Sequence, residues 1–232
     1  QIAKLAKDTS ELFLDDVDLD FSSCCFFEAN MAAPFYVLIR SLFEALNDVS
    51  LNNMSIKIRE ILQKNHFLNV FGEDSLKDSM QTTIPFRIFK LNSEQHFNDY
   101  LGNYMRGRGI PTMSQALTKK FLQSLLEIFT NASIHSGSQW GIFACGQFFP
   151  NRHRMDFTVA DAGVGFLENV RRFTQRNDIS SSEAISWALD EGHSTKGQGY
   201  PGGLGLKLIK DFIRLNKGKL QIVSRFGYCE FA

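Results

Sequence analysis

The stretch from Phe121 to Ser136, FLQSLLEIFTNASIHS, constrains the fold of this chain more than any other segment. On a helix with about 3.6 residues per turn, its apolar residues fall along one stripe and its polar residues along the adjoining one. The apolar stripe comprises Leu117, Phe121, Leu125, Ile128 and Ala132, and the polar stripe comprises Lys120, Ser124, Glu127 and Asn131. We therefore predict a helix over 114–135 on which Glu127 and Asn131 face a cavity together. The alternative is a solvated helix face, because such pairs are common there.

Composition and charge narrow the range of partners. The chain has 232 residues, enough for one large domain or two modest ones, and its 25 basic and 25 acidic side chains cancel. We therefore expect neither nucleic acid nor an anionic membrane as a partner. No apolar run approaches the roughly 20 residues that cross a bilayer. The cysteines form no C-x-x-C pair, so we expect a cytoplasmic protein without a zinc site or disulfides.

The first 72 residues alternate between strand and helix patterns. Val17, Leu19 and Phe21 alternate with aspartates, which is the period-two pattern of a strand. A helical stripe follows at Leu38, Leu42, Ala45 and Leu46. We expect strands at 12–21 and 48–51 and helices at 31–46 and 55–67. This order predicts a small α/β domain.

This N-terminal unit resembles an STAS domain, the fold of anti-sigma-factor antagonists. The resemblance rests on LDFSSCCFFEANMAAPF and IKIREILQKNHFLNVFG, and it covers about residues 10–72. Members that are switched by phosphorylation carry Ser or Thr at the start of the first helix, where this chain has Glu28, Ala29 and Asn30. We therefore do not expect a phosphorylation switch at that position. The alternative is a plain α/β docking domain.

A second, larger domain is predicted over residues 84–232, after a short polar linker at 73–83. We expect strands at 84–91, 140–149 and 154–160 and helices at 92–105, 114–135 and 182–189. The two later strands are expected to form a hairpin through residues 150–153. Because the sequence opens on Gln1 and ends at Ala232 inside an expected strand, we also expect a truncated last strand and a longer gene product.

Two glycine motifs frame a predicted ligand site. Asp161 ends an expected strand, and Gly163 and Gly165 follow it; an aspartate there can accept a hydrogen bond from an amine such as adenine N6. A single D-x-G-x-G motif also suits an ordinary turn. The second motif, GGLGL at 202–206, opens an expected helix, whose bare N–H groups can bind phosphate. The polar run GHSTKGQGYPGG before it is predicted to be a mobile lid.

Three motifs in a fixed order together resemble one known ATP-binding domain. They are E-x-x-x-N on a helix, D-x-G-x-G after a strand and G-G-L-G-L at the start of a helix. This domain is the GHKL or Bergerat fold shared by gyrase B subunits, heat-shock chaperones, histidine kinases and MutL. The resemblance covers about residues 82–232. It implies an α/β (α+β) chain, with a C-terminal two-layer α/β sandwich of the histidine kinase-like ATPase type and a smaller STAS-like domain before it.

Residue by residue, the resemblance implies an Mg-ATP site. Asn131 would hold Mg²⁺, and the metal would bridge the phosphates of ATP. Glu127 would orient or deprotonate the attacking water, and Asp161 would fix the adenine. The other nucleotide contacts would come from Gly163, Gly165, Thr195, Lys196, Gly202, Gly203, Leu204, Gly205 and Ser224.

Each of these further contacts has an implied role. The first glycine motif would let the base and the lid approach, and the second would cradle the phosphates. Lys196, or Thr195 beside it, would reach the γ-phosphate from the lid, with a solvated lysine as the alternative. Ser224 would reach adenine through a water molecule, although a serine is also an ordinary strand residue.

Three functions follow from this reading and stay open at this point. The first is a slow ATPase whose lid regulates an attached domain or a partner. The second is a serine/threonine protein kinase like those of anti-sigma factors. The third is an ATP-sensing switch without chemistry. The carboxylate of Glu127 favours the first two, because classical histidine kinases usually place an amide there. We expect ATP and a protein as partners, the protein bound through the STAS-like domain or the lid. A homodimer is an open alternative.

Overall fold

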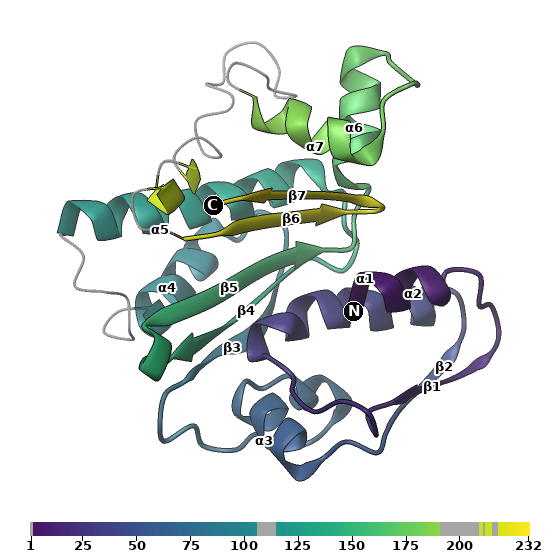
Figure 1. Cartoon of the computed structure of the whole chain (residues 1–232), viewed down its shortest axis with the longest axis vertical. Coiled ribbons are helices and arrows are strands. Elements are labelled where there is room, and N and C mark those ends of the chain that lie inside the picture. The colour runs from purple at the N-terminus through teal and green to yellow at the C-terminus, as the bar shows by residue number, and fades with distance from the viewer. Residues whose placement is uncertain (1, 106–114, 191–208, 211, 215–217) are drawn as a thin grey trace. The chain divides into compact units, whose positions relative to one another are not determined.

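The computed structural model describes residues 2–105, 115–190, 209–210, 212–214 and 218–232, and Figure 1 labels its helices and strands. The chain forms two compact units, each assembled from segments that are distant in sequence. Unit 1 comprises Gln1–Lys90, Asp99–Pro111 and Trp140–Ala162, and unit 2 comprises Leu91–Asn98, Thr112–Gln139 and Gly163–Ala232. The sequence predicts contiguous domains at 1–72 and 84–232, whereas these units interleave. The physical reason is that strands from the second half of the chain share an apolar core with the first 72 residues.

The N-terminal part of unit 1 has the predicted order of strands and helices. Its elements are α1 (Ile2–Asp8), β1 (Asp16–Asp20), a 3₁₀ turn (Ala29–Met31), α2 (Ala32–Glu44), β2 (Asp48–Asn52), α3 (Ile56–Lys64) and a 3₁₀ turn (Leu68–Phe71). β1 and β2 pair in parallel, and Val17 and Leu19 point into the core, which confirms the period-two prediction. The helix predicted over 31–46 corresponds to α2, and its predicted end was wrong. Leu46 adopts a φ of 56° and is 62% exposed, so the helix ends before it.

Three antiparallel strands form the second sheet of unit 1. They are β3 (Thr83–Phe89), β4 (Ile142–Phe149) and β5 (Arg154–Asp161), in the order β3-β4-β5. A short 3₁₀ turn at Pro150–Arg152 joins β4 to β5, so the predicted hairpin is confirmed. The register of β3 against β4 shifts between Ile84 and Arg87. Pro85 lies within that shift, where a residue without an N–H group costs no ladder hydrogen bond.

Aromatic rings dominate the core of unit 1. Helix α2 contacts β2 as well as β4 and β5, so the core connects both sheets of the unit. Phe67 is fully buried, and its ring lies within 5.4–6.4 Å of the rings of Phe35, Tyr36, Phe71 and Phe86. Tyr36 also meets Phe143 edge to face at 4.9 Å. Such edge-to-face pairs add to the stabilisation that burial alone provides.

Unit 2 contains the long helix and a two-stranded sheet. Its elements are α5 (Gln115–His135), α6 (Gly165–Thr174), α7 (Ser181–Leu189), β6 (Leu220–Ser224) and β7 (Gly227–Phe231). The twelve-residue helix α4 (Glu94–Met105) begins in unit 2 and continues in unit 1. Strands β6 and β7 are antiparallel, and α7 packs against β7 and α6.

The buried face of α5 differs from the predicted stripe. Its buried residues are Ser124, Leu125, Phe129 and Ser133, so only Leu125 is shared with the prediction. The ring of Phe129 stacks on that of Phe97 from α4, with the ring centres 4.3 Å apart. The buried positions Phe129 and Ser133 each lie one residue after the predicted positions Ile128 and Ala132. Glu127 and Asn131 are partly buried.

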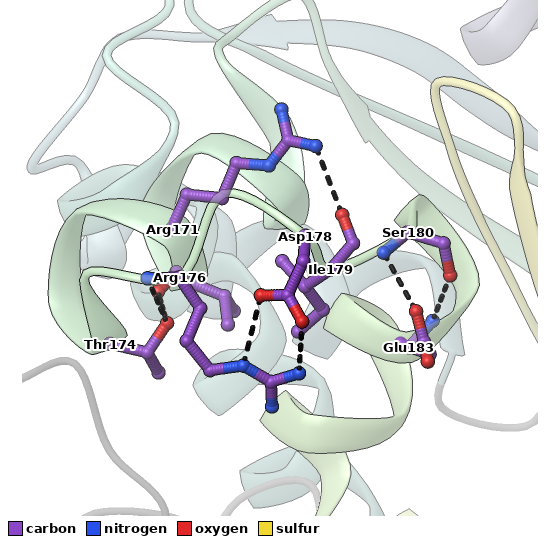
Figure 2. Close-up of polar contacts among 8 residues, drawn as sticks. Arg171, Thr174, Arg176, Asp178, Ile179, Ser180 and Glu183 are labelled. Carbon is purple, nitrogen blue, oxygen red and sulfur yellow. Dashed lines mark hydrogen bonds and ion pairs between the residues drawn. The ribbon is translucent and has the colours of Figure 1, made fainter.

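The connection between α6 and α7 is held by polar contacts (Figure 2). The guanidinium of Arg176 donates two hydrogen bonds to the Asp178 carboxylate, at 3.2 and 3.0 Å. Ser180 caps α7: its hydroxyl accepts from the Glu183 N–H, and the Glu183 carboxylate accepts from the Ser180 N–H. This capping box explains why α7 begins one residue before the predicted start at 182.

The structure is a mixed α/β chain with small sheets. Within the described ranges, no helix combines the length and the apolar character needed to cross a bilayer.

Candidate functional site

The D-x-G-x-G segment leaves β5 and turns directly into α6. The N–H of Val164 donates to the carbonyl of Ser136, just after the end of α5, at 2.8 Å. Gly163 fits beside the same carbonyl because it has no side chain: a Cβ there would come within 2.0 Å of the Ser136 oxygen. Gly163 is therefore required by the packing of the turn against the end of α5.

Gly165 is required for two reasons. Its φ is +75°, a conformation that favours glycine, and a Cβ there would come within 2.6 Å of the Ser224 hydroxyl. That hydroxyl accepts a hydrogen bond from the N–H of Phe166 at 3.1 Å. Ser224 thus satisfies one of the N–H groups that the start of a helix leaves without a partner. Its predicted contact with adenine through water stays a prediction, and the hydroxyl keeps its own proton to donate.

Asn169, which the sequence reasoning did not single out, contacts both the end of α5 and the glycine turn. Its side-chain nitrogen donates to the carbonyl of His135 at 2.8 Å and to the carbonyl of Gly165 at 3.1 Å. His135 is the last residue of α5, where helix carbonyls lack partners within the helix. The only available signal was an asparagine four residues after Gly165, which has meaning only once α6 is known.

The structure brings several predicted site residues to one place in unit 2. Gly163, Gly165 and Ser224 meet around the turn that packs on the end of α5, and Asn131 lies one helical turn before His135 on that helix. Glu127 lies one turn further back. Within the described ranges, the side chains of Glu127 and Asn131 make no hydrogen bond or ion pair with another described side chain.

The other predicted site residues are not described as part of unit 2. Asp161 is the last residue of β5, as predicted, and pairs with Ile142 of β4; it belongs to unit 1. The residues of the lid and the second glycine motif, Thr195, Lys196, Gly202, Gly203, Leu204 and Gly205, lie outside the described residues.

Few side chains within the described ranges gather as potential metal ligands. No group of three or more His, Cys, Asp or Glu side chains within the described ranges could hold a metal ion. Magnesium usually keeps water and phosphate oxygens as ligands and takes few from the protein. The partly buried carboxamide of Asn131, with the Glu127 carboxylate one turn away, is chemically compatible with such a shared site.

Cysteine chemistry is not supported at the most buried thiol. Cys145 lies in the core of unit 1, where its sulfur accepts from the N–H of Ala33 at 3.3 Å and donates to the carbonyl of Asn30 at 3.2 Å. Burial raises the pKa of this thiol to about 12. Because the thiolate is the reactive form, Cys145 is a packing residue and not a nucleophile.

Comparison of the chain with protein-family models, with curated proteins and with solved structures found no match.

Proposed function

We propose that this chain binds Mg-ATP in a site of the GHKL type and hydrolyses it slowly, with a nucleotide-dependent lid that regulates an attached domain or a partner protein. The observation that carries the proposal is the glycine turn clamped onto the end of α5. The turn contributes Gly163 and Gly165, and the same helix carries the partly buried side chains of Glu127 and Asn131 one and two turns before its end. A glycine turn packed on a helix that carries a carboxylate and a carboxamide supports a nucleotide site of this class.

Each residue has a separate task in this proposal. The carbonyl oxygen of Asn131 would hold Mg²⁺, which supplies charge neutralisation of the phosphates when bound. Glu127 would accept a proton from water as the water oxygen bonds to the γ-phosphorus and ADP leaves. Asp161 would accept a hydrogen bond from the adenine amine. The chain would thereby position and activate water, and no covalent intermediate with the protein is needed.

The remaining parts of the proposal concern architecture and context. The C-terminal part would form the two-layer sandwich of histidine kinase-like ATPases, and residues 1–72 would form an STAS-like domain that transmits the nucleotide state to a protein partner. All four cysteines are free thiols, and the proposed location is the cytoplasm.

Turnover with γ-labelled ATP tests this function. Glu127→Ala is expected to keep the affinity for Mg-ATP and to lower phosphate release on the order of a hundredfold, because it removes the base without touching the metal ligand. Gln123→Ala, an exposed change one turn earlier on α5, is the matched control and should leave both quantities unchanged.

The destination of the label separates the three functions. Label released as phosphate supports the ATPase, label on an added protein partner supports the kinase, and binding without any turnover supports the switch. A wild-type chain that binds no Mg-ATP would contradict all three.

A further inference from the structure

We propose that Asn169 is a positioning residue of the nucleotide site, an inference that rests on the function proposed above. Through one carboxamide it fixes the glycine turn Gly163–Gly165 against the end of α5. It thereby sets the affinity for a ligand that must contact both of these elements.

The geometry of the side chain supports this role. An asparagine NH₂ group has two hydrogens, and here two carbonyls accept from it, His135 at 2.8 Å and Gly165 at 3.1 Å. One carbonyl belongs to the end of α5 and the other to the glycine turn. The bond to His135 therefore joins the two elements, and the bond to Gly165, four residues back in α6, holds the Asn169 side chain in place at the turn.

A second hydrogen bond joins the same elements beside it. The N–H of Val164 donates to Ser136, so the consecutive carbonyls of His135 and Ser136 both accept from the segment that opens α6. We call this set of contacts the α5 clamp; it consists of His135, Ser136, Val164, Gly165 and Asn169. A helix end whose carbonyls are held by fixed donors has little freedom to shift relative to the turn.

The clamp lies close to the proposed metal ligand. Asn131 precedes His135 by four residues, which is a rise of about 6 Å along a helix. A shift of the helix end would therefore move the carboxamide of Asn131 relative to Gly163–Gly165. Mg-ATP would contact both sides of the clamp, whereas adenosine has no phosphates and would not reach Asn131. Loss of the clamp should weaken the first ligand selectively.

Calorimetric titration of the full chain with Mg-ATP and with adenosine tests this inference. Asn169→Leu keeps the size of the side chain and removes both donors. We expect it to weaken Mg-ATP binding on the order of tenfold, because two hydrogen bonds are lost, and to leave adenosine binding unchanged. Hydrogen exchange at the Val164 N–H should become faster in the same variant, which reports the clamp without any ligand.

Two controls separate positioning from stability. Val170→Ala, on the buried side of α6, destabilises the same helix by loss of packing and leaves the clamp intact, so Mg-ATP affinity should hold. Asn169→Gln retains the two donors on a longer side chain and should recover part of the affinity. If Asn169→Leu does not fold, Asn169→Ser serves in its place, since it is smaller and admits water.

The outcomes distinguish the two proposals. Wild-type affinity for Mg-ATP in Asn169→Leu, or an equal loss of both ligands matched by Val170→Ala, would overturn the positioning role alone. A wild-type chain without affinity for Mg-ATP would overturn the proposed function, and the positioning role with it.

Discussion

Unit 1 and the glycine turn of unit 2 are each stabilised internally, by different kinds of contact. Unit 1 has a continuous apolar core with a cluster of aromatic rings around Phe67. In the described part of unit 2, the contacts that fix the glycine turn are polar, and they come from Ser136, Asn169 and Ser224. Apolar packing is non-directional, whereas hydrogen bonds fix the distance and the angle between two groups. The difference indicates that directional contacts set the position of the glycine turn in the proposed nucleotide site.

The largest effect should come from breaking the apolar core of unit 1. Phe67→Ala removes a fully buried ring and should lower the free energy of unfolding by roughly 3–5 kcal/mol, because a cavity remains. Trp140 belongs to unit 1, where the Arg40 guanidinium lies 3.3 Å from its ring centre. Urea unfolding followed by Trp140 fluorescence in a Trp187→Phe background measures the change.

The matched control for this prediction is another phenylalanine of unit 1. Phe26 is 64% exposed, so Phe26→Ala should change stability by less than about 0.5 kcal/mol. Equal losses at Phe67 and Phe26 would mean that the aromatic cluster does not hold unit 1 together.

A smaller effect should follow from disturbing the glycine turn of unit 2. Gly163→Ala places a Cβ where the carbonyl of Ser136 lies, so the turn must move, at a cost of roughly 1–3 kcal/mol. Gly102→Ala, at a helix position with no atom within 4 Å of the new Cβ, should instead be neutral or stabilising by up to about 1 kcal/mol. Thermal unfolding by circular dichroism compares the two. A Gly163→Ala chain as stable as Gly102→Ala would show that the turn is not tightly packed.

The smallest effect concerns the exposed polar cluster on the β6–β7 hairpin. Hydrogen bonds from Tyr228, Gln221 and Lys219 lower the pKa of Glu230 from its ordinary 4.5 to about 2. A carboxyl whose pKa is lower in the folded state adds stability above pH 4.5 and loses it as the pH falls towards 2. Solvent and salt screen the cluster, so the contribution is small.

Glu230→Gln isolates this contribution. The variant should show a flatter dependence of the unfolding midpoint on pH between 4.5 and about 2 than the wild-type chain. A Glu230 carboxyl that titrates near 4.5 by NMR would contradict the pKa assignment.

Local sequence patterns predicted most of the elements, and contacts between distant residues account for the misses. The β4–β5 hairpin and α5 follow from alternation and helical spacing alone. Helix α6 was not predicted, because it begins at Gly165 without a side-chain cap from its own N-terminus. Its cap is the hydroxyl of Ser224, 58 residues away from Phe166, and no local pattern encodes such a contact.

The same limit applies to the candidate site. The order of the motifs placed Gly163 and Gly165 in one turn, because spacing along the chain suffices for that. The reasons why both must be glycine lie in Ser136 and Ser224, which only the folded chain brings near. Asn169 was missed for the same reason. The interleaving of the two units likewise depends on a core shared by distant strands.

Isothermal titration calorimetry with ATP, with and without Mg²⁺, tests the central claim most directly. The account predicts one binding site per chain, affinity that depends on Mg²⁺, and a loss on the order of tenfold or more in Asn131→Ala, which removes the proposed metal ligand. Gln123→Ala should bind as the wild-type chain does. The absence of any heat of binding from adenine nucleotides in the presence of Mg²⁺ would contradict the account.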